Sequence, residues 1–452
     1  MGKKLQKSYA YMGWWESYPR DIMTEYRQSI EEGLDIEEYK DLFEVVSKMP
    51  DNEAKHQMSD VLFNIVLNAD IKEGYSYNEP SELEAIKSLR EKFKLPKKKL
   101  GKRALESKIH GAWMGRVVGC LLGKPVEGVH TYHLHPILKE SGNFPMHRYI
   151  SSKDLPDEIR NDEKHWLRNK CWIDTVKYMP FDDDTNNTVM GQILIEKYGR
   201  GFTPVDVKNE WLKLQPKESY CTAERVAFKN FMMGYNPPES ALYKNPFREW
   251  IGAQIRGDYF GYINPGKPEA AADMAFRDAS ISHIKNGIYG EMFASAMIAA
   301  AAVCDSCEDI ILAGLGEIPK TSRLYENVML VLNGYREGKT KDDCYALIHG
   351  MWNEANGHDW CHTISNAMIV AYALLYGEND FGKSICLAVE ACFDTDCNGA
   401  TVGSVMGMKN GIESIGEEWT SPINNTIETT LIGVGMVNIK EAVKKTLEHI
   451  SK

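Results

Sequence analysis

Apolar side chains recur at helical spacing along most of the chain, and few segments alternate as a half-buried β-strand does. In the first ninety residues the repeating apolar positions are Trp14, Trp15, Tyr18, Ile22, Tyr26 and Ile30, and the pattern continues over 39–49 and 60–68. Further helices are predicted over 189–198, 270–279, 288–303, 310–314, 366–376, 381–391 and 439–450. The pattern therefore predicts an all-α protein.

Changes in this pattern and in composition divide the chain into three parts. Residues 1–90 form a helical N-terminal extension, residues 91–108 form a basic linker, and residues 109–452 form one large domain. We expect the extension to pack beside the large domain as a helical cap, because its aromatic stripe needs a partner surface. Residues 132–173 and 213–263 are expected to be long loops, and loops of that length in a compact domain often carry function.

Glycine repeats every fourth residue in two distant stretches, 111–123 and 399–407. Each glycine costs a helix up to about 1 kcal/mol, so the repeat indicates a flat face against which another backbone packs closely. The first stretch is followed by Glu127, and the second is preceded by Asp394 and Asp396. Antiparallel packing of the two predicted helices would bring these three carboxylates to one rim.

Two short acidic clusters open predicted helices. The first is Asp182, Asp183 and Asp184, and the second is Asp394 and Asp396 beside Cys397. An aspartate at a helix start is ordinarily a cap, but one aspartate is enough for one helix. Crowded carboxylates repel unless a proton or cation holds them, and hard divalent ions prefer oxygen ligands. The clusters together predict a two-metal site, and such sites usually perform hydrolysis.

Composition restricts the partners and the compartment. The chain has 452 residues, 43% hydrophobic and 26% charged, with a net charge of −11, which disfavours nucleic acid and anionic membranes as partners. The longest apolar run, 292–304, is too short to span a bilayer, and no apolar segment follows Lys3 and Lys4 as a signal peptide requires. The ten cysteines are scattered, so we expect free thiols and a cytoplasmic location.

Four stretches, taken in order, resemble the ADP-ribosylglycohydrolase family. They are 111–127 (Gly-Ala-Trp-Met-Gly through Lys-Pro-Val-Glu), 182–185 (Asp-Asp-Asp-Thr), 264–283 and 394–403 (Asp-Thr-Asp-Cys-Asn-Gly-Ala-Thr-Val-Gly). This family includes the dinitrogenase-reductase activating glycohydrolase and the ADP-ribosylhydrolases that release ADP-ribose from arginine or serine. The resemblance covers about residues 108–450. It implies an all-α orthogonal helical bundle with two Mg²⁺, sometimes Mn²⁺, at its centre.

The resemblance also implies site residues. The metal ligands fall on Asp182, Asp183, Asp184, Asp394, Asp396 and Cys397. Asp182 and Cys397 stand where the best-known members have threonine. Asp182 adds negative charge, and the sulfur of Cys397 suits Zn²⁺, Fe²⁺ or Mn²⁺ better than Mg²⁺ if it binds the metal.

For catalysis we select Glu127, because it lies outside both ligand clusters and a free carboxylate can take a proton from a metal-bound water. Asp183 and Asp396 are counted with it as catalytic residues. The alternative for Glu127 is an exposed glutamate that merely follows a helix.

Six further residues are candidates for substrate binding: Arg256, Asp258, Asp278, His283, His362 and Asn366. Asp258 lies in a glycine- and aromatic-rich segment, where the alternative is an ordinary turn aspartate. His283 suits a diphosphate or a supporting role, and a core histidine is the alternative. His362 and Asn366 share one predicted helical face.

The leading function is metal-dependent hydrolysis of a ribosyl C1 bond, releasing ADP-ribose from a modified protein or small molecule. One alternative is a hydrolase of free ribosides or nucleotide metabolites, in a pocket closed by the two expected loops and the extension. A second is a non-catalytic binding or structural protein, which the retained carboxylates argue against. The expected partner is an ADP-ribosyl or ribosyl substrate, with the chain as a monomer or homodimer.

Overall fold

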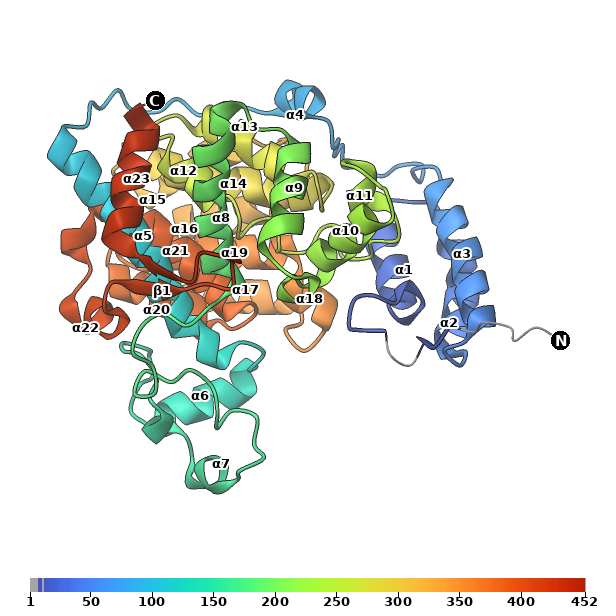
Figure 1. Ribbon diagram of the computed structural model, residues 1–452, viewed down its shortest axis with the longest axis horizontal. Coiled ribbons are helices and arrows are strands. Elements are labelled where there is room, and N and C mark those ends of the chain that lie inside the picture. The colour runs from blue at the N-terminus through green and yellow to red at the C-terminus, as the bar shows by residue number, and fades with distance from the viewer. Residues whose placement is uncertain (1–6, 10–11, 452) are drawn as a thin grey trace.

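The computed structural model describes residues 7–9 and 12–451, and within them it is built almost wholly of α-helices (Figure 1). The expectation attached to Lys3 and Lys4 lies outside the described residues. The extension contributes α1 (Ile22–Glu31), α2 (Lys40–Lys48), α3 (Glu53–Leu67) and α4 (Leu83–Leu89). No helix of the described part is long and apolar enough to cross a membrane.

The other helices begin with α5, whose first seven residues, 102–108, fall in the predicted linker, and the rest belong to the large domain. They are α5 (Lys102–Gly123), α6 (Thr131–Glu140), α7 (Asp157–Asn161), α8 (Asp183–Tyr198), α9 (Pro204–Leu214), α10 (Thr222–Met232), α11 (Glu239–Leu242), α12 (Asp258–Tyr262), α13 (Pro268–Ala279), α14 (Lys285–Ala301), α15 (Cys307–Leu315), α16 (Arg323–Arg336), α17 (Lys341–Met351), α18 (Gly357–Cys361), α19 (Thr363–Tyr376), α20 (Phe381–Glu390), α21 (Thr395–Asn410), α22 (Glu417–Thr420) and α23 (Ile439–Ser451). Two short strands, β1 (Thr426–Glu428) and β2 (Met436–Asn438), pair antiparallel.

The prediction of two long loops was wrong, because both segments contain helices. The segment 132–173 contains most of α6 and all of α7, and 213–263 contains α10, α11 and α12. α6 has Pro136 inside it, and α11 and α12 are four and five residues long. A proline within a helix is a helix-breaking signal, and helices this short do not repeat an apolar position often enough to be recognised in the sequence. Figure 1 shows α6 and α7 projecting away from the rest of the large domain.

Helices α5 and α21 pack antiparallel at the centre of the large domain, as the glycine repeats predicted. A Cβ added at Gly115 would lie 2.1 Å from the Gly403 carbonyl oxygen, and one at Gly119 would lie 1.9 Å from that of Gly399. Any larger side chain would force the helices apart. At the end of this seam Thr395 Oγ1 donates to the Gly123 carbonyl at 2.9 Å, which joins the last turn of α5 to the first of α21.

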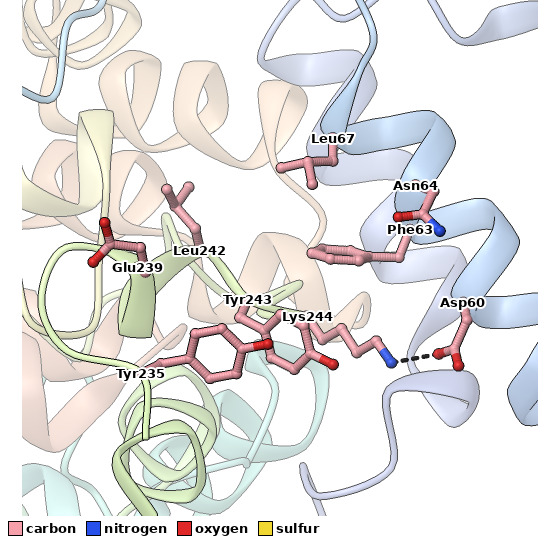
Figure 2. A pocket seen from close by; sticks show the side chains of 9 residues that line it. All are labelled: Asp60, Phe63, Asn64, Leu67, Tyr235, Glu239, Leu242, Tyr243 and Lys244. Atoms are coloured by element: carbon pink, nitrogen blue, oxygen red, sulfur yellow. Dashed lines mark hydrogen bonds and ion pairs between the residues drawn. The ribbon is translucent and has the colours of Figure 1, made fainter. Parts of the chain in front are cut away.

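Helices α1 to α3 lie at one end of the molecule with an apolar cluster of their own (Figure 1). Between α3 and the segment that follows α10 there is a crevice of about 470 Å³, shown in Figure 2. Phe63 of α3 meets the ring of Tyr243 edge-on there, and Lys244 forms an ion pair with Asp60. The linker then runs along the large domain, where Lys92 pairs with Glu269.

A second part of the contact is buried and charged. Arg248 of the large domain pairs with Glu25 and Glu32 of the extension at 2.7 and 2.6 Å. Arg323 pairs with Glu79, which follows α3 in the chain, and with Glu249, each at 2.7 Å. Each of these carboxylates has a cation within contact distance, so the extension joins the large domain through paired charges as well as apolar surface.

Candidate active site

Carboxylates from three segments converge where the α5–α21 seam ends. Within each of three groups the ligand atoms all lie within 4.8 Å of one another: Glu127, Asp394 and Asp396; Asp184, Asp396 and Cys397; Cys120, Asp182 and Asp184. Asp396 and Asp184 each belong to two groups, so the two acidic clusters of the sequence form one centre. We call the six carboxylates Glu127, Asp182, Asp183, Asp184, Asp394 and Asp396 the acidic centre.

Helix N-termini position most of these side chains. Asp182 caps α8, and its side chain accepts a hydrogen bond from the Asp184 backbone N–H at 2.9 Å. Asp394 precedes α21, after two non-glycine residues, Cys392 and Phe393, with φ of 60° and 59°. Left-handed backbone at two such residues in succession is strained, and strain of this kind gathers at functional sites.

Burial and mutual repulsion dominate the electrostatics of the centre. Burial, then the charges of Asp182 and Asp183, raise the pKa of Glu127 to about 7. Burial followed by neighbouring carboxylates raises the pKa of Asp183, Asp394 and Asp396 well above the usual range. The centre thus holds more negative charge than it stabilises by itself.

Two cations meet the centre, and the sequence reasoning missed both. Burial raises the pKa of Asp184 well above its usual range although Arg116, buried in α5, pairs with it at 2.9 Å. Burial also opposes the charge of Asp182, but Lys124, whose Nζ lies 2.7 Å away, outweighs burial, so the pKa of Asp182 is lowered. Arg116 had a signal in the sequence, since it is the one charged residue of 111–123.

Buried oxygens without hydrogen-bond partners indicate whether the acidic centre suits a metal ion. Among the described residues, Asp184 Oδ2 and Asp396 Oδ1 are buried and have no hydrogen-bond partner. Both residues group with the buried Cys397, whose thiol pKa is raised by burial and by nearby carboxylates. Two carboxylate oxygens and a sulfur within contact of one another are a donor set that a divalent cation satisfies, so the residues fit a metal site.

Two of the predicted substrate-binding residues contact the acidic centre. Asn366 Oδ1 accepts hydrogen bonds from the Asp394 backbone N–H at 3.1 Å and from Asn398 at 2.8 Å. Asp258 is fully buried and lies 2.9 Å from Arg116, the arginine that also holds Asp184. Asp258 and Asn366 therefore lie behind the acidic carboxylates and fix their positions.

The other predicted substrate-binding residues lie further back. Arg256 pairs with Asp278 and, at 3.1 Å, with Glu224, whose charge acts on Asp183. His283 is fully buried, and its Nδ1 lies 2.8 Å from Ser282 Oγ. Glu224 is a further residue of the site region that could not be selected from the sequence, where nothing distinguishes it from an ordinary helical glutamate.

His362 belongs to a different group, with His358 and Glu31 of the extension. His358 Nε2 lies 2.9 Å from Glu31, and His362 Nε2 lies 3.8 Å from it. The Nδ1 atoms accept N–H bonds from Trp250 and from the Ile364 backbone. A neutral ring whose Nδ1 accepts carries its proton on Nε2, so His358 donates an N–H to Glu31, while His362 Nε2 is buried without a hydrogen-bond partner among the described residues. In this protonation state neither ring offers an Nε2 lone pair to a metal.

Comparison with known proteins identifies the family of this chain. The chain belongs to the ADP-ribosylglycohydrolase family, whose model matches residues 101–446. Membership makes it a glycosyl hydrolase, and the all-α fold is that of the family.

A solved structure described as an ADP-ribosylglycohydrolase-related protein complex is 18% identical to this chain. The similarity covers 77% of this chain and 98% of that one, with a TM-score of 0.47. No functionally curated protein matches the sequence.

Proposed function

We propose that the chain is a divalent-metal-dependent hydrolase that cleaves the C1 glycosidic bond of a ribosyl group, releasing ADP-ribose from an ADP-ribosylated protein or small molecule. The observation that carries the proposal is the acidic centre, with buried carboxylate oxygens that no protein donor reaches. Family membership supports the bond type. The free state of all ten cysteines supports a cytoplasmic location.

The residues divide into metal holders and a proton acceptor. Asp183, Asp184, Asp394, Asp396 and Cys397 would hold the metal, with Asp182 beside them. Two bound divalent ions, Mg²⁺ or Mn²⁺, would orient ribose hydroxyls and acidify a water. Glu127 is half-buried at the edge of the centre, and the pKa of about 7 suits a carboxylate that takes a proton near neutral pH.

The supporting residues keep this geometry. Asn366 fixes the backbone of Asp394, the pair of Arg116 and Asp258 fixes Asp184, and Arg256 with Asp278 fixes Glu224. We propose positioning roles for Asn366, Asp258, Arg256 and Asp278, because their polar atoms are engaged by protein groups.

The test of metal dependence uses an ADP-ribosylated protein as substrate. We expect EDTA to abolish release of ADP-ribose, and Mg²⁺ or Mn²⁺ to restore it. Binding should also raise the melting temperature, since a ligand at about 100 times its Kd stabilises the fold by about 2.7 kcal/mol. Full activity of the thoroughly metal-stripped chain would contradict the proposal.

A second candidate is hydrolysis of a free riboside or nucleotide metabolite. It is favoured by α6, which begins four residues after Glu127 and is held by hydrogen bonds from Thr131 to Glu354. An ordered element beside the proposed base narrows access for a protein surface. Hydrolysis rates measured in parallel on an ADP-ribosylated protein and on free ribosides distinguish the two candidate functions. Turnover of the modified protein alone would exclude hydrolysis of a free metabolite.

A further inference from the structure

Asp182 differs from its neighbours in the acidic centre because both of its carboxylate oxygens have protein donors. Oδ1 accepts the Asp184 backbone N–H at 2.9 Å, and Oδ2 lies 2.7 Å from Lys124 Nζ. In the same centre Asp184 Oδ2 and Asp396 Oδ1 are buried without a partner. The oxygens that need a cation therefore belong to residues other than Asp182.

Lys124 is placed by the chain itself. It is the first residue after α5 and is followed by Pro125, in a short 3₁₀ turn that continues the helix. Its side chain is 21% exposed and lies over the ring of Phe181, the residue before Asp182. The ammonium group is thus held between a proline-fixed turn and an aromatic face, which restricts it to the neighbourhood of Asp182.

Charge explains why these two residues occur together. An aspartate at position 182 adds one negative charge to a centre that already has five other carboxylates, and burial makes each further charge costly. Lys124 adds one positive charge at contact distance, so the pair is neutral. A neutral pair leaves the net charge of the centre as an uncharged residue at position 182 would.

We propose that Lys124 is a built-in cation of the acidic centre that withholds Asp182 from the metal ions, so that Asp183, Asp184, Asp394, Asp396 and Cys397 bind them without it. The inference rests on the proposed metal dependence and determines which ligands serve it. It also makes Lys124 a determinant of metal affinity, because its charge repels a divalent ion that the carboxylates attract.

The first experiment measures Mn²⁺ and Mg²⁺ binding by calorimetry for the full chain and its variants. Lys124→Met should bind Mn²⁺ at least about tenfold more tightly, because a positive charge has left the centre and Asp182 is released. Lys124→Arg, which keeps the charge, should stay within about threefold of the wild type. Lys170→Met is the matched control, since Lys170 also acts on Glu127 but stacks over Trp166, and it should bind as the wild type does.

The decisive variant is the double change Asp182→Ala with Lys124→Met, which removes both charges of the pair and leaves no side-chain oxygen at position 182 to bind an ion. If Asp182 is not a ligand, the double variant binds Mn²⁺ within about threefold of the wild type. A loss of tenfold or more in the double variant, or unchanged affinity in Lys124→Met, overturns the inference. Failure of the wild-type chain to bind either ion overturns the proposed function instead.

A readout without metal separates the pair from the ions. In EDTA, Lys124→Met should lower the melting temperature, because Asp182 stays buried without its cation. The double variant should recover most of that loss, so the two changes are not additive. Additive losses would show that Lys124 and Asp182 do not act as a pair, and would overturn the inference whatever the metal affinities are.

Discussion

The acidic centre and the contact between the extension and the large domain both bury several carboxylates. At the contact each of them has an arginine beside it, whereas most carboxylates of the acidic centre have no cation beside them in the described part of the chain. At the contact, Glu25 and Glu32 meet Arg248, and Glu79 and Glu249 meet Arg323. Burial would raise the pKa of Glu249, but Arg323 and His362 outweigh it, so that the pKa is strongly lowered. In the acidic centre most carboxylates have raised pKa values and some oxygens have no partner.

The difference separates charge that stabilises the fold from charge kept for function. The buried carboxylates of the contact each have an arginine beside them, and losing that cation is what makes them costly. Unpaired ones destabilise the fold, and under the proposed function they would acquire their partner when a divalent cation binds. The same residue type thus fixes the extension in one region and prepares a reaction in the other.

The largest effect is expected from removing a carboxylate of the centre. Asp394→Asn or Asp183→Asn should lower kcat/KM by at least about 100-fold, because metal ligation contributes several kcal/mol to such reactions. The melting temperature in EDTA should not fall, since one less carboxylate relieves repulsion. Activity assays and thermal unfolding measure both quantities, and a variant that is active but unstable would reverse the comparison.

At the contact between the extension and the large domain, removing a cation should instead lower the free energy of unfolding. Arg323→Met leaves Glu79 and Glu249 buried without their arginine and should cost about 3–5 kcal/mol in the free energy of unfolding. Arg336→Met on the same helix is the matched control, because its pair with Glu308 is exposed and should cost less than about 1 kcal/mol. Urea denaturation of both variants makes the measurement, and equal costs would refute the contrast.

Acid should weaken the contact through Glu31. Burial opposes its charge, but the hydrogen bond from His358 and neighbouring groups, Arg27 among them, together outweigh burial and lower the pKa of Glu31 to about 2. A depressed carboxylate pKa contributes stability that is present above about 4.5 and is lost as pH falls toward 2. The full loss is about 3.5 kcal/mol, at about 1.4 kcal/mol per pKa unit. Unfolding free energies from pH 7 to pH 3 should fall less steeply for Glu31→Gln, whereas the exposed Glu448→Gln should follow the wild type.

The smallest effect concerns metal choice within the centre. If the sulfur of Cys397 binds the ion, Cys397→Thr should shift preference toward Mg²⁺ and away from Mn²⁺ or Zn²⁺, because it replaces a soft ligand by oxygen. Relative affinities for the ions give the answer. An unchanged order would place the sulfur outside the ligand set, as a small buried side chain.

The sequence predicted the parts of the fold that depend on a periodic pattern. Helices α8 and α19 end where expected, at Tyr198 and Tyr376, because apolar periodicity and a following glycine mark those ends. Helices α16 and α17 were missed, and α6 was taken for loop because Pro136 interrupts it. A proline inside a helix hides its apolar spacing, but α16 and α17 are unbroken helices of 14 and 11 residues, and this reason does not account for missing them.

By itself, the sequence determined the all-α class, the close antiparallel packing of α5 and α21, and the meeting of Glu127 with Asp394 and Asp396, since glycine at every fourth position leaves few other arrangements. The sequence also identified the acidic residues that form the acidic centre. Only the tertiary structure decided which of them meet a cation of the protein: Arg116 pairs with Asp184, and Lys124 pairs with Asp182. It also decided that His362 faces the extension instead of the acidic centre. The reason is that a charge at a buried position is governed by partners from distant segments, and spacing along the chain does not reveal which segments those are.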